Sequence, residues 1–211
     1  MRDKSGFYHR DGKEYISVTK VLSYIDKPGL RYYYGKHGTV KAEEMSSEAK
    51  DIGTKVHDLV RQDMEGIEIA YTKIRKKQLK NAFQSYKLFK SEFELPKEEI
   101  VILDWKASDY VAKEHELQLA AYHSALQYSK TTEFASGWNP EVTLYNDKEL
   151  YAGTADAIYI PPVESCNVKL LVVYLGKEEV KYKVVEVQEI DRRYKEFVNL
   201  KNFVLSWLGK V

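Results

Sequence analysis

An aspartate and a lysine stand two residues apart at the end of an apolar run. Asp104 and Lys106 follow Ile100–Leu103, a stretch of branched residues that suits a strand buried on both faces. Residues two apart on a strand point to the same face, so both side chains are expected to project together. Burying a carboxylate and an ammonium is costly unless each finds a partner or an ion. The pair is therefore a satisfied structural ion pair or part of a catalytic site, and the motif alone favours neither.

Another acidic residue, Asp156, lies among apolar neighbours in a predicted strand. Gly153 of the same strand lacks a side chain, which often marks the close approach of another group. Glu141 stands fifteen residues before Asp156, across a predicted turn, so one hairpin could carry both carboxylates into one pocket. The structural alternatives are a turn-supporting aspartate and an exposed strand glutamate. For Glu141 the structural role is favoured.

Two further groups of polar residues fall on predicted helices. His57 lies beside the apolar stripe of a helix near residues 47 to 64, with Gly53 close to the start of that helix. A lone histidine so placed is more often a packed, hydrogen-bonded residue than a ligand. Gln118 and Tyr122 are four residues apart and share one face of a later helix. Taken alone, these are ordinary helix residues.

The elements that must position these side chains follow from hydrophobic periodicity. Apolar residues at three- and four-residue steps predict helices from Thr19 with Ser17 as N-cap, near 47 to 64, and over 72 to 93, 114 to 128 and 190 to 208. Other apolar runs predict strands over 100 to 103, 141 to 146, 149 to 160, 168 to 175 and 179 to 188, with turns at Asn146-Asp147 and Gly176-Lys177. We predict one domain over residues 1–211, of mixed α/β class, with helices in residues 1–97 and a sheet with a C-terminal helix in residues 98–211.

Composition limits the functions open to the chain. The sequence has 211 residues, of which 44% are hydrophobic, so it can bury a substantial core. Lys plus Arg number 33 and Asp plus Glu 32, so any basic surface for nucleic acid must be local. The single cysteine, Cys166, is expected to be an ordinary small apolar residue, and one cysteine cannot supply an iron–sulfur cluster. No apolar leader or membrane-spanning run is present, so we expect a cytoplasmic protein with no membrane partner.

Together, the four polar groups resemble the RecB-like branch of the PD-(D/E)XK nuclease superfamily. That family combines a Gly-x-x-x-His helix, a Gly-x-x-Asp strand, an Asp-x-Lys strand and a helix with Gln-x-x-x-Tyr. This chain carries GTKVH, GTAD, DWK and QLAAY, and the resemblance covers most of residues 16 to 160. The opening SVTKVLSYIDKPGL is also similar to the N-terminal helix of phage and viral members, which implies a virus-encoded protein. Each motif is weak singly, and the four together are fairly specific.

The order of the motifs departs from the family. There the Gly-x-x-Asp strand precedes the Asp-x-Lys strand, whereas here Asp156 follows Lys106. Because a site is recognised by geometry rather than chain order, a circularly permuted restriction-endonuclease-like core could still bring Asp104 and Asp156 together. The connection over 129 to 140 is long enough to reposition the hairpin. The permuted order affects the assignment of Asp156 and Glu141 to the site more than the assignment of Asp104 and Lys106.

The resemblance implies a metal-dependent deoxyribonuclease acting in DNA replication, recombination or repair; exonuclease activity is one option, and the sequence leaves cutting at DNA ends or internally open. Asp104 and Asp156 would hold Mg²⁺ or Mn²⁺, which activates a water and relieves the charge of the phosphate. His57 would complete the metal shell and favour Mn²⁺. Lys106 would orient the water or stabilise the pentavalent phosphate.

By the same resemblance, Gln118 and Tyr122 would support the site or touch DNA, and Glu141 is a further candidate for the pocket. Arg31–Tyr34 offers aromatic faces for stacking bases and a cation for phosphate, although a packed aromatic cluster is the favoured role.

Three other functions stay open. A DNA-binding protein that keeps the nuclease fold without catalysis would show basic and aromatic surfaces but would have no need for Asp104, Lys106 and Asp156 together. A small-molecule hydrolase could use the same carboxylates, although no nucleophile elbow or phosphate-binding glycine loop is present. A structure-selective junction endonuclease would require a homodimer with two sites.

Overall fold

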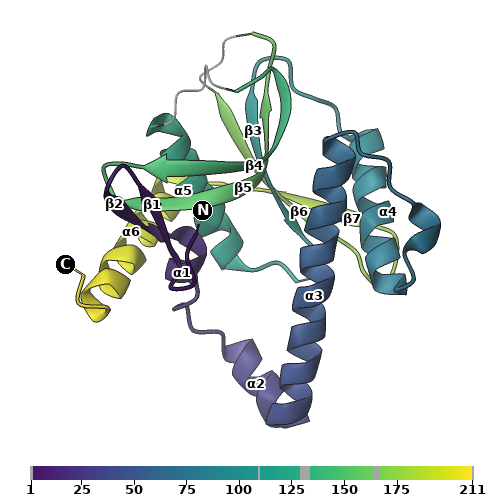
Figure 1. Cartoon of the computed structure of the whole chain (residues 1–211), viewed down its shortest axis with the longest axis horizontal. Helices are drawn as coiled ribbons and strands as arrows, with labels where there is room; N and C mark the ends of the chain where they lie inside the picture. Colours follow the sequence, from purple (N-terminus) through teal and green to yellow (C-terminus); the bar gives the residue numbers. More distant parts are fainter. Residues whose placement is uncertain (1, 109, 129–133, 164–166, 211) are drawn as a thin grey trace.

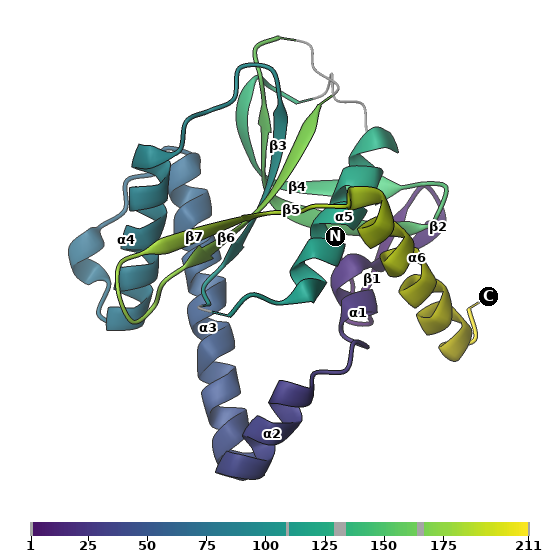
Figure 2. The same cartoon turned by 180° about the vertical axis from the view of Figure 1, so that it is seen from behind.

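A seven-stranded mixed sheet forms the centre of the computed structural model, and helices cover both of its faces (Figures 1 and 2). The structure describes residues 2–108, 110–128, 134–163 and 167–210, so Cys166 lies outside the described residues. The strands are β1 (Phe7–Arg10), β2 (Lys13–Ser17), β3 (Ile100–Lys106), β4 (Gly137–Asn146), β5 (Tyr151–Ile160), β6 (Val168–Leu175) and β7 (Tyr182–Glu186). The helices are α1 (Val18–Leu22), α2 (Pro28–His37), α3 (Thr39–Met64), the 3-10 turn η1 (Tyr71–Lys73), α4 (Lys77–Glu92), α5 (Lys113–Tyr128) and α6 (Ile190–Trp207). The predicted α/β class with one mixed sheet is confirmed.

The strand β3 lies at the centre of the sheet, antiparallel to β5 and parallel to β6. Its apolar side chains alternate between two cores, as strand geometry requires. Ile100 and Ile102 pack in the core shared with α1, α5 and α6. Val101, Leu103 and Trp105 pack in the core shared with α3 and α4. The prediction of a strand buried on both faces is therefore confirmed, and the strand continues through both motif residues to Lys106.

The strand β5 has one partner along one edge and two partners along the other. It pairs with β4 over its whole length, which confirms the hairpin predicted around Asn146-Asp147. Along the opposite edge, Tyr151 and Ala152 pair with β2, whereas residues 157 to 159 pair with β3. Residues 153 to 156 lie between these two ladders, so the sheet divides at this point.

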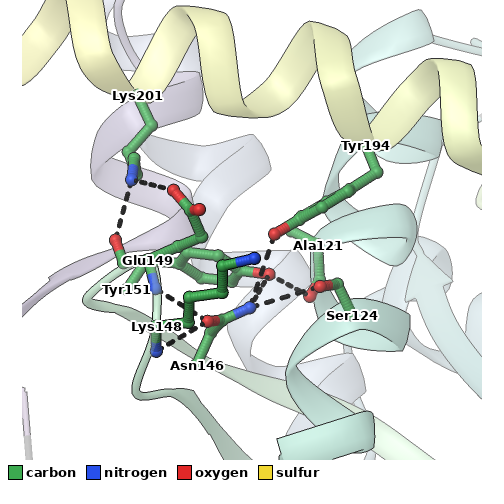
Figure 3. A network of polar contacts seen from close by, with 8 residues as sticks. All are labelled: Ala121, Ser124, Asn146, Lys148, Glu149, Tyr151, Tyr194 and Lys201. Atoms are coloured by element: carbon green, nitrogen blue, oxygen red, sulfur yellow. Dashed lines mark hydrogen bonds and ion pairs between the residues drawn. The ribbon is translucent and has the colours of Figure 1, made fainter.

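The β4–β5 turn is held by a buried polar network, which Figure 3 shows. The Asn146 amide donates to Ser124 Oγ at 3.2 Å and to the Tyr151 hydroxyl at 3.1 Å, and it accepts from two backbone amides of the turn. Lys201 of α6 is only 4% exposed and donates to the carbonyl and the carboxylate of Glu149, each at 2.8 Å. These contacts fix the turn against α5 and α6.

The N-terminal part of the chain is not wholly helical, contrary to prediction. The strands β1 and β2 form an antiparallel hairpin that extends the sheet. Asp11 and Gly12 connect them with φ angles of 51° and 72°, the left-handed values that a two-residue hairpin loop of type I′ needs. The predicted cap is confirmed, because Ser17 Oγ accepts from the Lys20 amide where α1 begins.

The helix predicted near residues 47 to 64 begins earlier, at Thr39, so Gly53 lies in the middle of α3 rather than near its start. Residues 26 to 50, here called the arm, comprise the end of the α1–α2 connection, α2 and the first part of α3. The arm projects from the body of the molecule (Figures 1 and 2). No helix of the described ranges is long and apolar enough to cross a membrane.

Candidate active site where the sheet divides

The two candidate aspartates lie where β5 separates from β3. The ladder between these strands ends at Leu103 and Ala157, and the next residue on each strand is Asp104 or Asp156. Beyond the ladder, the Trp105 amide donates to Asp156 Oδ2 at 2.7 Å, so a side chain takes the place of a strand partner. The antiparallel arrangement thus brings the two acids to neighbouring positions although they are far apart in the chain.

The Asp104 carboxylate is almost fully buried, with an exposed fraction of 1%. Its Oδ1 accepts from Lys106 Nζ and from Gln118 Nε2, each at 3.0 Å. Its Oδ2 lies 2.7 Å from Lys106 Nζ, but in a direction that makes an ion pair without a hydrogen bond. Burial raises the pKa of Asp104 to about 6; the Lys106 ammonium opposes this rise and the charge of Asp156 adds to it. Asp104 Oδ2 is therefore paired with the Lys106 ammonium by charge alone.

The Gln118 amide of α5 joins the aspartate to the lysine. Its nitrogen donates to Asp104 and to the Tyr122 hydroxyl, the latter at 2.9 Å, while its oxygen lies 3.4 Å from Lys106 Nζ. The amide thus turns its donor to the carboxylate and its acceptor to the ammonium. Burial raises the pKa of Tyr122 well above its usual value, so its hydroxyl stays neutral. Both predicted α5 residues belong to the cluster.

Gly153 is required by the position of the Tyr122 ring. A Cβ at residue 153 would lie 2.4 Å from Tyr122 Cε1, closer than real side chains approach. The glycine of the Gly-x-x-Asp motif therefore admits the aromatic ring of the Gln-x-x-x-Tyr motif. This confirms the prediction that the glycine marks the close approach of another group.

His57 of α3 reaches Asp156 from the other side. Its Nδ1 lies 3.2 Å from Asp156 Oδ1. Burial would raise the pKa of Asp156, but the nearby His57, Lys106 and Trp105 amide outweigh burial and lower it. Burial would likewise lower the pKa of His57, but the carboxylates of Asp156 and Asp104 raise it. These shifts favour a charged pair, in which one ring nitrogen of the histidine is already engaged by Asp156.

Lys106 stays charged in this arrangement. Burial would lower the pKa of Lys106, but the carboxylates of Asp104 and Asp156 outweigh burial and raise it. The side chain is 20% exposed and is held between Asp104 and Gln118. The structural ion pair that the sequence left open is therefore present, and Lys106 is placed as a fixed positive charge.

A cleft of about 640 Å³ opens beside the cluster, with Lys106 and His57 in its wall. The arm side of the cleft is lined by Asp26, Lys27 and Tyr33, and the opposite side by residues that follow β3 and begin α5. The charged cluster is thus accessible from solvent through two of its own members.

A metal ion at this cluster would have few protein ligands. Within the residues that the structure describes, no group of three or more His, Cys, Asp or Glu side chains is placed to hold a metal. Mg²⁺ commonly takes only one or two carboxylates and completes its shell with waters and substrate phosphates. Asp104 Oδ2 could serve as one such ligand only after Lys106 shifts away from it, and Asp156, whose oxygens meet His57 and the Trp105 amide, could serve as a second. His57 Nδ1 faces Asp156 Oδ1 at 3.2 Å, so the histidine is placed to hold that carboxylate.

The Glu141 carboxylate lies outside the cluster. Glu141 stands opposite Asp156 in the hairpin register, because Pro140 pairs with Ala157 and Val142 with Ala155. Its backbone is left-handed, with φ of 49°. The side chain is exposed and pairs with Arg61 Nε at 3.7 Å. The structure therefore gives the pocket role of Glu141 no support and matches the exposed strand glutamate.

Several contacts of the site carry no signal that sequence reasoning could use. The Trp105 amide bonds Asp156 through the backbone, which any residue could do. His115 lines the cleft and contacts the Tyr174 hydroxyl at 2.9 Å, and burial lowers the pKa of His115 to about 4, so its ring is neutral. Tyr33, which the sequence marks only as one member of Arg31–Tyr34, lines the cleft.

Comparisons of the chain with protein-family models, with curated proteins and with solved structures found no match. The function is therefore argued from the site itself.

Proposed function

We propose that this protein is a divalent-metal-dependent deoxyribonuclease with a permuted PD-(D/E)XK-like core. One observation carries the proposal: residues of four separate motifs contact one another beside a cleft. Asp104 and Lys106 of β3 are joined by Gln118 of α5, and Asp156 of β5 meets His57 of α3. The neighbouring, antiparallel placement of β3 and β5 supports a site that survives the permuted motif order.

Phosphodiester hydrolysis needs an activated water and relief of charge on the phosphate. A bound Mg²⁺ or Mn²⁺ supplies both. Asp104 and Asp156 would hold the ion. The Lys106 ammonium, held 3.0 Å from Asp104 Oδ1, would stabilise the charge that develops on the phosphate. Gln118 would keep the lysine and the aspartate at a fixed separation, and His57 would fix the orientation of Asp156.

A DNA-binding protein without catalysis is the second candidate. Lys106 Nζ lies 2.7 Å from Asp104 Oδ2, and a protein that uses neither residue in catalysis would keep this structural ion pair. The two candidates differ in the response to metal. Only the nuclease requires a divalent ion for a chemical change in DNA.

The test is incubation of the protein with linear and closed circular DNA, each single- or double-stranded, in Mg²⁺, Mn²⁺ or EDTA. We expect cleavage in at least one of the two metals and none in EDTA. Asp104→Asn, purified in parallel, controls for contaminating nuclease and should be inactive. DNA binding without cleavage in any metal would favour the second candidate.

A further inference from the structure

A pocket lined by aromatic side chains lies on the face of β3 opposite the Asp104 cluster. Trp105 stands between Asp104 and Lys106 in the strand, so its ring points to the other face of the sheet and packs in the core shared with α3 and α4. Figures 1 and 2 show these two helices side by side. This hollow, here called the aromatic pocket, is lined by Met64, Tyr86, Phe89, Lys90, Phe93, Leu95, Trp105 and Trp138. None of the described residues lines both this pocket and the cleft beside Lys106.

The aromatic pocket is too large to be an ordinary packing defect. Its volume is about 260 Å³, whereas voids in a protein core are rarely larger than one water molecule. An apolar cavity of about 150 Å³ already holds benzene, so this pocket has room for a group of two fused rings. Leu95 at its edge is 47% exposed, so the apolar lining reaches the surface.

The rings of the pocket hold one another in place. The Trp105 ring stands edge-on to the rings of Tyr86 and Phe89, with centroids 5.4 and 5.3 Å away. Phe89 in turn stacks on Phe93 at 4.7 Å. Such ring contacts have preferred geometries and stabilise the arrangement beyond the burial of area. The pocket is therefore preformed, and an apolar guest need not reorganise its wall.

The wall also contains a polar group without a partner. Trp105 Nε1 is buried and has no hydrogen-bond partner among the described residues. Buried N–H groups are nearly always paired, and each exception calls for an explanation. A hydrogen-bond acceptor carried by a bound molecule is one way to satisfy this donor.

The charge beside the aromatic pocket favours an anionic guest. Lys90 is the one charged residue in the described lining. Its ammonium and that of Lys87 lie 2.7 and 2.8 Å from the same carboxylate, Asp63, so two positive charges share one negative charge. Aromatic rings can also attract a cation, but Lys90 Nζ already lies 6.0 Å from the centroid of the Tyr86 ring. The excess positive charge opposes a second cation and attracts an anion.

We propose that the aromatic pocket binds a small anion with a flat apolar body, of the class of aromatic carboxylates. The apolar body packs against the rings of Phe89 and Trp105, and the anionic group lies beside Lys90. Because the Trp105 backbone amide binds Asp156 Oδ2, the ligand contacts a residue that also holds the candidate active site. The binding itself does not depend on the proposed nuclease function.

The test is calorimetric titration of the protein with three probes that share one two-ring body and differ in charge: naphthalene-2-carboxylate, 2-naphthylmethanol and 2-naphthylmethylammonium. We expect the carboxylate to bind most tightly and the ammonium most weakly. Leu95→Trp places a large ring at the exposed edge of the pocket and should abolish binding of all three probes. Its circular dichroism spectrum should be unchanged, because the replaced side chain is exposed.

Lys90→Met tests the charge preference separately from the fit of the rings. It should weaken carboxylate binding by roughly fivefold, the effect of losing a partly exposed ion pair, and should leave binding of the alcohol unchanged. Lys77→Met is the matched control, because Lys77 is exposed on the same helix and does not line the pocket. It should bind all three probes like the unaltered protein.

Two results would overturn the inference whether or not the protein cuts DNA. Absence of binding by all three probes, or binding that persists in Leu95→Trp, would show that the aromatic pocket is not a ligand site. Equal affinity for the carboxylate and the ammonium, or equal losses in Lys90→Met and Lys77→Met, would show that the proposed ligand class is wrong.

Discussion

Two clusters of buried polar side chains lie on α5 and the sheet, one around Asn146 and one around Asp104. Both central residues are shielded from solvent. Around Asn146, the amide nitrogen and oxygen both have partners, and the nearby Lys201 ammonium is matched by Glu149 (Figure 3). Around Asp104, one carboxylate oxygen has no hydrogen bond.

The clusters also differ in charge and in access. The Asp104 cluster brings two carboxylates, an ammonium and an imidazole together, and burial raises the pKa of Asp104 to about 6. It also borders a cleft through Lys106 and His57. Buried polar groups that are fully hydrogen-bonded stabilise a fold, whereas several charges buried together carry a large desolvation cost. Burial of polar residues alone therefore does not distinguish the two clusters; the concentration of charge and the access to a cleft do.

The largest expected effect is that of Asp104→Asn on cleavage. The substitution keeps the shape of the side chain but removes the negative charge that would hold a metal. We expect loss of cleavage by roughly a thousandfold or more, measured as the single-turnover rate in Mg²⁺ or Mn²⁺. The circular dichroism spectrum should be unchanged. If the variant still cut DNA at nearly the original rate, the role of Asp104 would be structural, like that of Asn146.

The next effect is that of Lys106→Met, which removes the fixed positive charge at similar volume. We expect the single-turnover rate to fall on the order of a hundredfold, while DNA affinity in Ca²⁺ is kept, because a contact made in the transition state affects turnover more than binding. Lys106→Arg should restore little of the cleavage rate, because the planar guanidinium of arginine does not replace the compact ammonium of lysine. Full activity of Lys106→Met would show that Lys106 serves only in a structural ion pair.

Asn146→Ala should affect stability rather than chemistry. It removes the partner of two backbone amides and of the Tyr151 hydroxyl. Leaving buried polar groups unpaired costs roughly 2 kcal/mol of unfolding free energy, which urea denaturation would measure. The cleavage rate of the folded protein should not change. If Asn146→Ala lost cleavage at unchanged stability, the claim that only the Asp104 cluster takes part in cleavage would be wrong.

Lys201→Met should have the smallest effect and is the counterpart of Lys106→Met. Removing one partner of a buried pair leaves the other charge unmatched, but the Glu149 carboxylate retains some access to water, which limits the cost. We expect a loss of about 1 kcal/mol in unfolding free energy and no change in cleavage. Equal losses of cleavage in the two methionine variants would contradict the assignment of separate roles.

The sequence predicts the elements that hold the site because their periodicity is strong. The apolar run before Asp104 predicted a buried strand, and β5 and α5 were predicted within two residues of their observed bounds, whereas β4 begins at Gly137, four residues before the predicted start. Gly153 was correctly read as a point of close approach, and the Tyr122 ring fills that space. Local patterns of this kind can be predicted from the sequence because each depends on a few neighbouring residues.

The missed features depend on more distant partners or on a turn signal that was overlooked. Asp11-Gly12 between two alternating segments is a hairpin signal that could have revealed β1 and β2. The Trp105 amide gives no such signal, since backbone groups are the same in every residue. The exposed position of Glu141 follows from its left-handed backbone and its contact with Arg61, neither of which its spacing from Asp156 predicts.

The central claim is that Asp104 and Asp156, although reversed in chain order, hold one divalent ion. Calorimetric titration of Mn²⁺ into the unaltered protein, Asp104→Asn and Asp156→Asn tests it most directly, with Asn146→Ala as the control. We predict binding by the unaltered protein and by Asn146→Ala, and loss of that binding in both aspartate variants. Undiminished Mn²⁺ binding by Asp104→Asn, or no binding by the unaltered protein, would contradict the account.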